Sequence, residues 1–150
     1  MKVERIDHIH ILVKDIKGAM SFFSDIMGTR FVGPLDMPRI NAAFDSIGLE
    51  LISPKSEESP FYQILEQEGE GLLSIGLKVP DLDEAIAELE ARGLSIMLRA
   101  NLPALKVAVF HPQGAYGVRL ELLQYDSMQP AAIVNLINVG KISELPWFQG

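Results

Sequence analysis

The chain has 150 residues, 48% of them hydrophobic and 22% charged, which suits one ordinary domain or two small modules and excludes a disordered chain. Its 20 acidic and 13 basic residues give a net charge of -7, so we expect no nucleic acid and no membrane surface as partner. The absence of cysteine excludes disulfides, thiolate nucleophiles and cysteine-based metal sites. The sequence shows neither a signal peptide nor an apolar run of ~18 residues, and we expect a cytoplasmic protein.

Two parts of the sequence repeat the same order of features. One strand-like run ends at Asp15 and a second ends at Asp81, and a helical pattern follows each of them. Further along, Leu-Glu-Leu-Ile at 49–52 corresponds to Leu-Glu-Leu-Leu at 120–123. A repeat of this kind predicts two modules built from the same elements.

The first module begins with a β-rich run over residues 3–13. Asp15 stands at a helix N-cap position, where its carboxylate accepts from unpaired backbone amides. Apolar residues then recur at helical spacing as far as Gly28, which ends the helix. Three further strands are predicted at roughly 29–34, 39–45 and 48–53.

The second module repeats this order after a short connecting helix. Ser59-Pro60 is predicted to open that helix, with the proline at the first helical position. In the second module Asp81 is the expected N-cap, and Gly93 ends the helix. The last three strands are predicted at roughly 95–99, 105–111 and 117–125.

Each module is therefore predicted to be a βαβββ unit. We assign the chain to the α+β class, with two tandem βαβββ modules forming a partly closed, barrel-like sheet around a cavity. The predicted division is a single domain at 1–125, comprising module one (1–58), a linker helix (59–69) and module two (70–125), followed by a C-terminal extension at 126–150.

Alternation along the strands predicts which side chains face the cavity. Ile9, Ile11 and Val13 form an aliphatic set that should pack under the first helix, which leaves His8 and His10 on the cavity side.

His8, Glu50 and Glu121 are predicted to converge on that cavity from three strands. Carboxylates in a partly buried hollow repel each other and lose hydration, and a divalent cation bound by them and a neutral imidazole compensates for both effects. Two metal-free explanations stay open at this point. A glutamate in a Leu-Glu-Leu run often faces water, and Arg119 on the same face could form a salt bridge with Glu121.

The paired modules, with His8 early in the first strand and Glu121 in the last, resemble the vicinal oxygen chelate superfamily. That superfamily includes glyoxalase I, extradiol dioxygenases, and fosfomycin and bleomycin resistance proteins. Within it the sequence is most similar to the methylmalonyl-CoA epimerase family. The matching segments lie at 6–15, 49–72, 79–93 and 105–125.

The resemblance implies a divalent metal held by one residue from each of four strands. The corresponding positions here are His8, Glu50, Ser74 and Glu121. Ser74 stands where the family has a histidine, and because a hydroxyl is a poor ligand, its place falls to water, substrate or His10. Without a second family histidine, iron dioxygenase chemistry is disfavoured, and we expect one Zn, Ni, Co, Mn or Mg ion.

The resemblance further implies an isomerase or lyase of the epimerase–glyoxalase type, in which a base removes a proton α to a metal-held carbonyl. His10 and Asp45 are the candidate catalytic bases, and we prefer His10 because imidazole titrates near neutrality. The expected partner is a small-molecule substrate. An acyl-CoA is a candidate, although no cluster of basic residues specifies one. The alternative is a metal-free small-molecule binding protein, like the bleomycin resistance members.

The last 25 residues, from Asp126, are unusually apolar for a chain end. Ile133, Leu136, Ile137 and Trp147 are too apolar to remain in water. We therefore expect a homodimer whose interface includes residues 130–148, and the alternative is that this extension forms a lid over the cavity.

Overall fold

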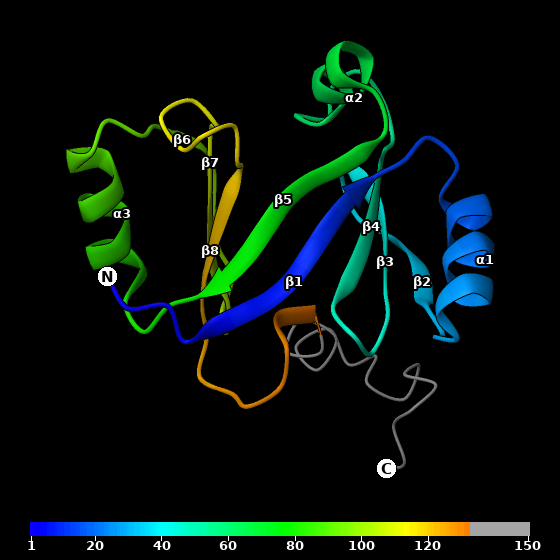
Figure 1. Cartoon of the computed structure of the whole chain (residues 1–150), viewed down its shortest axis with the longest axis horizontal. Helices are drawn as coiled ribbons and strands as arrows, with labels where there is room; N and C mark the ends of the chain where they lie inside the picture. The colour runs from blue at the N-terminus through cyan, green and yellow to red at the C-terminus, as the bar shows by residue number, and fades with distance from the viewer. Residues whose placement is uncertain (133–150) are drawn as a thin grey trace. The chain divides into compact units, whose positions relative to one another are not determined.

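The computed structural model describes residues 1–132, which contain eight strands and three helices (Figure 1). The first module consists of β1 (Arg5–Leu12), α1 (Ile16–Met27), β2 (Val32–Asp36), β3 (Ile40–Phe44) and β4 (Leu49–Pro54). After α2 (Tyr62–Glu68), the second module consists of β5 (Gly71–Lys78), α3 (Leu82–Ala91), β6 (Ile96–Asn101), β7 (Lys106–Phe110) and β8 (Leu120–Gln124). None of these helices is long and apolar enough to span a bilayer.

The two modules have the same strand topology. In the first, the strand order is β2-β3-β4-β1, with β1 parallel to β4 and the remaining pairs antiparallel. In the second, the corresponding order is β6-β7-β8-β5, with β5 parallel to β8. The predicted α+β class and the repeated βαβββ unit are therefore confirmed.

The chain folds as two compact units, and the boundaries between them fall inside β1 and inside β5. Among the described residues, 1–8 and 74–132 form one unit and 9–73 form the other. Asp7 and His8 consequently belong to the unit that contains β5 to β8, whereas His10 belongs to the unit that contains β2 to β4.

Helix α1 begins and ends where the capping residues predict. The Asp15 side chain accepts a hydrogen bond from the Gly18 amide at 3.1 Å, and Gly28 adopts a left-handed conformation with φ of 66°. The helix packs on the aliphatic face of its module, as expected from the alternation along β1. Its core consists of Val13, Ile16, Ala43 and Leu51, with Ile11, Ala19, Met20 and Phe23 packed against them.

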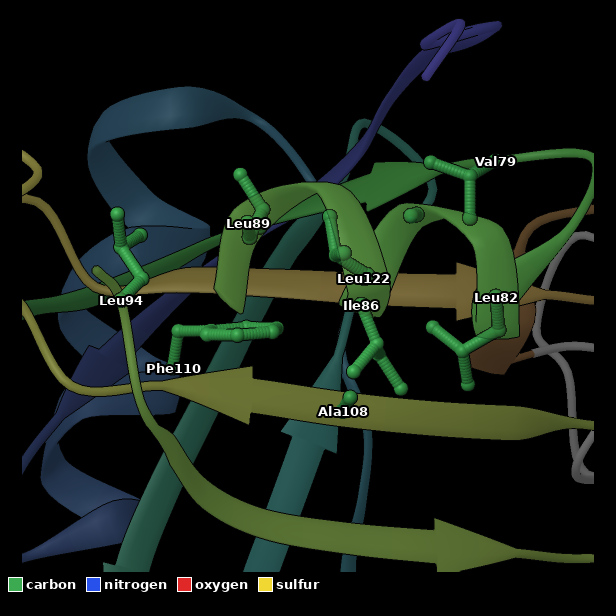
Figure 2. Packing of buried hydrophobic residues seen from close by; sticks show 9 residues of the cluster. Val79, Leu82, Ile86, Leu89, Leu94, Ala108, Phe110 and Leu122 are labelled. Atoms are coloured by element: carbon green, nitrogen blue, oxygen red, sulfur yellow. The ribbon is translucent and has the colours of Figure 1, made fainter. Parts of the chain in front are cut away.

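Helix α3 covers the corresponding face of the second module. Asp81 caps it by accepting from the Glu84 amide at 3.0 Å. Figure 2 shows Leu82, Ile86 and Leu89 of the helix, which pack with Phe110 on β7 and Leu122 on β8. The helix thereby occupies one face of this sheet.

Several predicted starts are wrong by two or three residues, including that of β2, which begins at Val32 and not near 29. Two of the others have a local cause. Helix α2 begins at Tyr62 and not at Pro60, because Ser59 and Pro60 form a preceding turn in which the Ser59 hydroxyl accepts from the Phe61 amide at 3.3 Å. Strand β8 begins at Leu120 and not at 117, because Tyr116 and Gly117 have positive φ angles of 57° and 79°, which a strand does not accommodate.

The proposed dimer interface at 130–148 lies almost entirely outside the described residues. Within the described part of the extension, Ala131 is buried and packs with Leu105, Leu123 and Tyr125.

Candidate functional site

His8 lies between two carboxylates in the unit that contains β5 to β8. Its Nδ1 atom is 2.7 Å from Asp7 Oδ1, and its Nε2 atom is 3.2 Å from Glu121 Oε2. All three side chains are buried, at 4%, 0% and 7% exposure for His8, Asp7 and Glu121. The structure therefore brings together two of the four predicted metal ligands, His8 and Glu121.

Strands β5 and β8 leave room for the imidazole by placing a glycine opposite the glutamate. Gly76 is the register partner of Glu121, so the two residues share a face of the sheet. A Cβ atom at Gly76 would lie 2.6 to 2.9 Å from the three nearest atoms of the His8 ring. Ser74, two residues earlier on β5, is also buried and lies on the same face as Gly76.

We predict that Gly76→Ala displaces the His8 ring and lowers the free energy of unfolding by about 2 kcal/mol, the usual scale for overpacking. Chemical denaturation measures this loss. In a His8→Ala background the ring is absent, so the same substitution should have little effect on stability. An equal loss in both backgrounds would show that contact with His8 is not the cause.

Asp7 is held in its ionised form by several donors. It accepts hydrogen bonds from His8, from the Tyr125 hydroxyl, and from the Ala131 amide at 3.2 Å. Burial acts to raise the pKa of Asp7, but the hydrogen bonds from His8 and Tyr125 outweigh it, and the pKa lies below its ordinary value. Burial and the hydrogen bond to Asp7 correspondingly raise the pKa of the Tyr125 hydroxyl.

The ionised Asp7 determines which nitrogen of His8 carries a proton. A carboxylate only accepts hydrogen bonds, so the proton lies on Nδ1, and Nε2 presents either a lone pair or a second proton to Glu121. A lone pair facing a carboxylate is repulsive unless a cation lies between them. A metal-binding histidine commonly donates its other ring N–H to a carboxylate, so this donor set fits a divalent metal ion.

His10 and Glu50 form a second pair, in the unit that contains β2 to β4. The two residues are register partners on the parallel strands β1 and β4, and His10 Nε2 lies 2.5 Å from Glu50 Oε2. Their side chains are 11% and 16% exposed. Glu50, predicted as a metal ligand, is therefore hydrogen-bonded to the predicted base.

Asp45, the second candidate base, lies in the turn between β3 and β4. Its Oδ1 atom accepts from the amides of Ile47, Gly48 and Leu49 at 2.9 to 3.1 Å. Its Oδ2 atom is buried and has no hydrogen-bond partner among the described residues. These contacts stabilise the turn, and the catalytic role of Asp45 stays a prediction.

Sequence reasoning missed Asp7 and Tyr125. Alternation along β1 assigns Asp7 to the face opposite His8, so Asp7 was not among the candidate residues. The available signal was the Asp-His pair itself, since a carboxylate next to a histidine can fix its tautomer. No sequence pattern points to Tyr125 as a partner for Asp7.

Comparisons with known proteins identify the family. Residues 7–108 match the model of the Glyoxalase/Bleomycin resistance protein/Dioxygenase superfamily. The chain is 32% identical over 130 residues to Uncharacterized protein YqjC of Bacillus subtilis (strain 168), covering 81% of this chain and 93% of that protein. It is 27% identical over 132 residues to mitochondrial Methylmalonyl-CoA epimerase of Mus musculus, covering 82% and 74%.

Solved structures show the same fold. A variant of Streptomyces coelicolor methylmalonyl-CoA epimerase in complex with 2-nitronate-propionyl-CoA matches with a TM-score of 0.72 at 23% sequence identity, covering 84% of this chain and 100% of that chain. The match of residues 7–108 to the family model shows that the chain belongs to the glyoxalase/bleomycin resistance protein/dioxygenase superfamily, and the resemblance noted from the sequence is confirmed.

Proposed function

We propose that this member of the superfamily is a metal-dependent isomerase or lyase of the epimerase–glyoxalase type, which removes a proton α to a carbonyl group. The observation that carries the proposal is the placement of the buried His8, with Nδ1 held by Asp7 and Nε2 directed at Glu121. Burying two carboxylates around one imidazole lowers the stability of the fold unless the site binds a cation or serves another function.

The metal would be held by His8 and Glu121, with Glu50 and Ser74 as the remaining proposed positions. A divalent ion there would polarise a substrate carbonyl and increase the acidity of the adjacent carbon. The Asp7 carboxylate orients the His8 ring, which keeps Nε2 directed at Glu121 and available to a metal ion. Zn, Ni, Co, Mn and Mg all accept this mixture of nitrogen and oxygen donors.

The proton would be taken by His10. His10 Nε2 lies 2.5 Å from Glu50 Oε2, so the carboxylate is placed beside the imidazole that would take up the proton. The imidazolium that results is stabilised by the negative charge of Glu50. A metal-bound glutamate is a weak base, so we assign proton transfer to His10 in preference to Glu50 or Glu121.

The substrate class is a small molecule with an acidic proton next to a carbonyl. The mouse relative is a methylmalonyl-CoA epimerase, and this similarity makes a 2-substituted malonyl or related acyl thioester the first candidate. We further propose that the protein is a cytoplasmic homodimer.

A metal-free binding protein is the second candidate function. It is favoured by one property of the same site, since a doubly protonated His8 between Asp7 and Glu121 would balance both charges without an ion.

Calorimetric titration of the unmodified protein in chelator-stripped buffer distinguishes the two candidates. We expect one divalent ion per chain to bind, with release of a proton if His8 is doubly protonated beforehand. The released proton is detected by repeating the titration in buffers of different ionisation enthalpy. Absence of uptake for all five metals would contradict the metal-dependent function and leave the binding protein.

A further inference from the structure

Buried hydrogen bonds connect the end of β8 to His8 through Asp7. The Tyr125 hydroxyl donates to Asp7 Oδ2, and the guanidinium of Arg5 donates to the Tyr125 oxygen. The Ala131 amide lies 3.2 Å from the same Asp7 oxygen. Asp7 Oδ1 meets His8 Nδ1 at 2.7 Å. Residues from both ends of the described chain thus converge on one carboxylate.

The segment that supplies the Ala131 amide is held in place by two cations. Arg5 donates to the carbonyl oxygens of Met128 and Gln129 at 3.1 and 3.0 Å. Lys78 donates to the carbonyl oxygen of Ser127 at 2.8 Å, and its ammonium group lies 4.4 Å from the centre of the Tyr125 ring. The Arg5 guanidinium also lies 3.8 Å from Asp7 Oδ2. Arg5 therefore supports Asp7 in three ways: by this ion pair, through Tyr125, and through the backbone that leads to Ala131.

These contacts constrain the geometry of the Asp7 carboxylate. The Tyr125 hydroxyl donates to Oδ2, and the Ala131 amide is shared between Oδ2 at 3.2 Å and Oδ1 at 3.3 Å. This arrangement leaves Oδ1 directed at His8 Nδ1. A carboxylate oxygen only accepts, so Asp7 Oδ1 accepts from His8 Nδ1. Loss of either donor would free the carboxylate to rotate, and the His8 proton would no longer be confined to Nδ1.

We propose that Tyr125 and Arg5 are positioning residues, which act through Asp7 to keep the His8 proton on Nδ1 and direct Nε2 at Glu121. The expected effect of Tyr125 and Arg5 on metal affinity rests on the proposed function. The expected position of the His8 proton is independent of it, because that position is a property of the metal-free protein.

The experiment uses the full metal-free chain and reads the His8 ring by long-range 1H–15N correlation. The chain has three histidines, so His→Ala variants assign each ring. We expect a protonated Nδ1 on His8 whose hydrogen exchanges slowly with solvent. In Tyr125→Phe and Arg5→Gln that hydrogen should exchange about tenfold faster, the effect of losing roughly one hydrogen bond.

Matched controls separate this effect from general destabilisation. Tyr116→Phe and Arg92→Gln change the same residue types at exposed positions and should leave the His8 signal unchanged. In the same variants, zinc titration should give a Kd about tenfold weaker for Tyr125→Phe than for Tyr116→Phe.

The outcomes are separable. An unchanged His8 signal in folded Tyr125→Phe and Arg5→Gln would overturn the proposal, even if both variants were less stable. If Tyr125→Phe does not fold, Arg5→Gln decides the question alone. If the unmodified protein takes up no zinc, the proposed function fails, and the exchange rate of the His8 hydrogen still decides the role of Tyr125 and Arg5.

Discussion

Replacing His10 with alanine is expected to slow exchange of the substrate α-proton with heavy water by about 100-fold or more, the scale of a positioned general base. The reason is that His10 is the proposed proton acceptor and Glu50, at 2.5 Å, stabilises its protonated form. The measurement is deuterium incorporation by NMR, in a panel of 2-substituted malonyl and α-keto thioesters with metal-loaded protein.

His111→Ala is the matched control for His10, because it removes an imidazole from an exposed loop. Its exchange rate should equal that of the unmodified protein. Glu50→Gln, which keeps the shape of the side chain but removes its charge, should fall between the control and His10→Ala. Equal exchange with and without protein, across the whole panel, would remove the isomerase proposal and favour the binding protein.

Replacing either His8 or Glu121 with alanine is expected to abolish metal uptake. Each substitution removes one of the two proposed ligands that the structure brings within 3.2 Å of each other. The measurement is calorimetric titration with each divalent metal. Because truncation leaves a buried charge without its partner, His8→Ala and Glu121→Ala should also lose stability, by about 3 kcal/mol.

Isosteric and surface variants make this result interpretable. Glu121→Gln keeps the volume of the side chain, and it too should fail to bind metal if the carboxylate is the ligand. Glu90→Ala removes an exposed glutamate and should bind as the unmodified protein does. Uptake by both Glu121 variants with unchanged affinity would place the metal elsewhere.

A substitution at Ser74 tests the metal site in the opposite direction, by an increase in metal affinity. Ser74 is buried on β5, on the same face as Gly76, which lies against His8. A histidine at this position would add an imidazole where the resemblance places one. Ser74→His is therefore expected to tighten metal binding, and the same titration measures the change.

The sequence determines the helix ends and the repeated modules because these depend on neighbours in the chain. Asp15 and Asp81 cap their helices through amides three residues away, so the capping signal is complete within a few positions. The convergence of His8 and Glu121 was also predictable. Alternation assigns each to a face, and the repeat indicates that the strand of Glu121 is the counterpart of the strand of Glu50, whereas the strand of Ser74 is the counterpart of the strand of His8.

Boundaries in irregular segments were less predictable. Ser59-Pro60 carries a valid helix-start signal, but the hydroxyl of Ser59 closes a turn before the helix begins at Tyr62. Sequence patterns cannot choose between these two uses of the same side chain, because both satisfy the same kind of backbone donor.

Only the tertiary structure decided how the His8 proton is held. Asp7 meets Tyr125 and Ala131, which are 118 and 124 residues away in the chain, and Arg5 meets Tyr125 in turn. No periodicity links positions so far apart. Alternation along β1 predicts only that Asp7 lies on the face opposite His8. The path of the chain after β8 decides which residues contact Asp7. The sequence therefore determines which side chains can bind a metal or a proton, whereas long-range packing decides which atom of His8 does so.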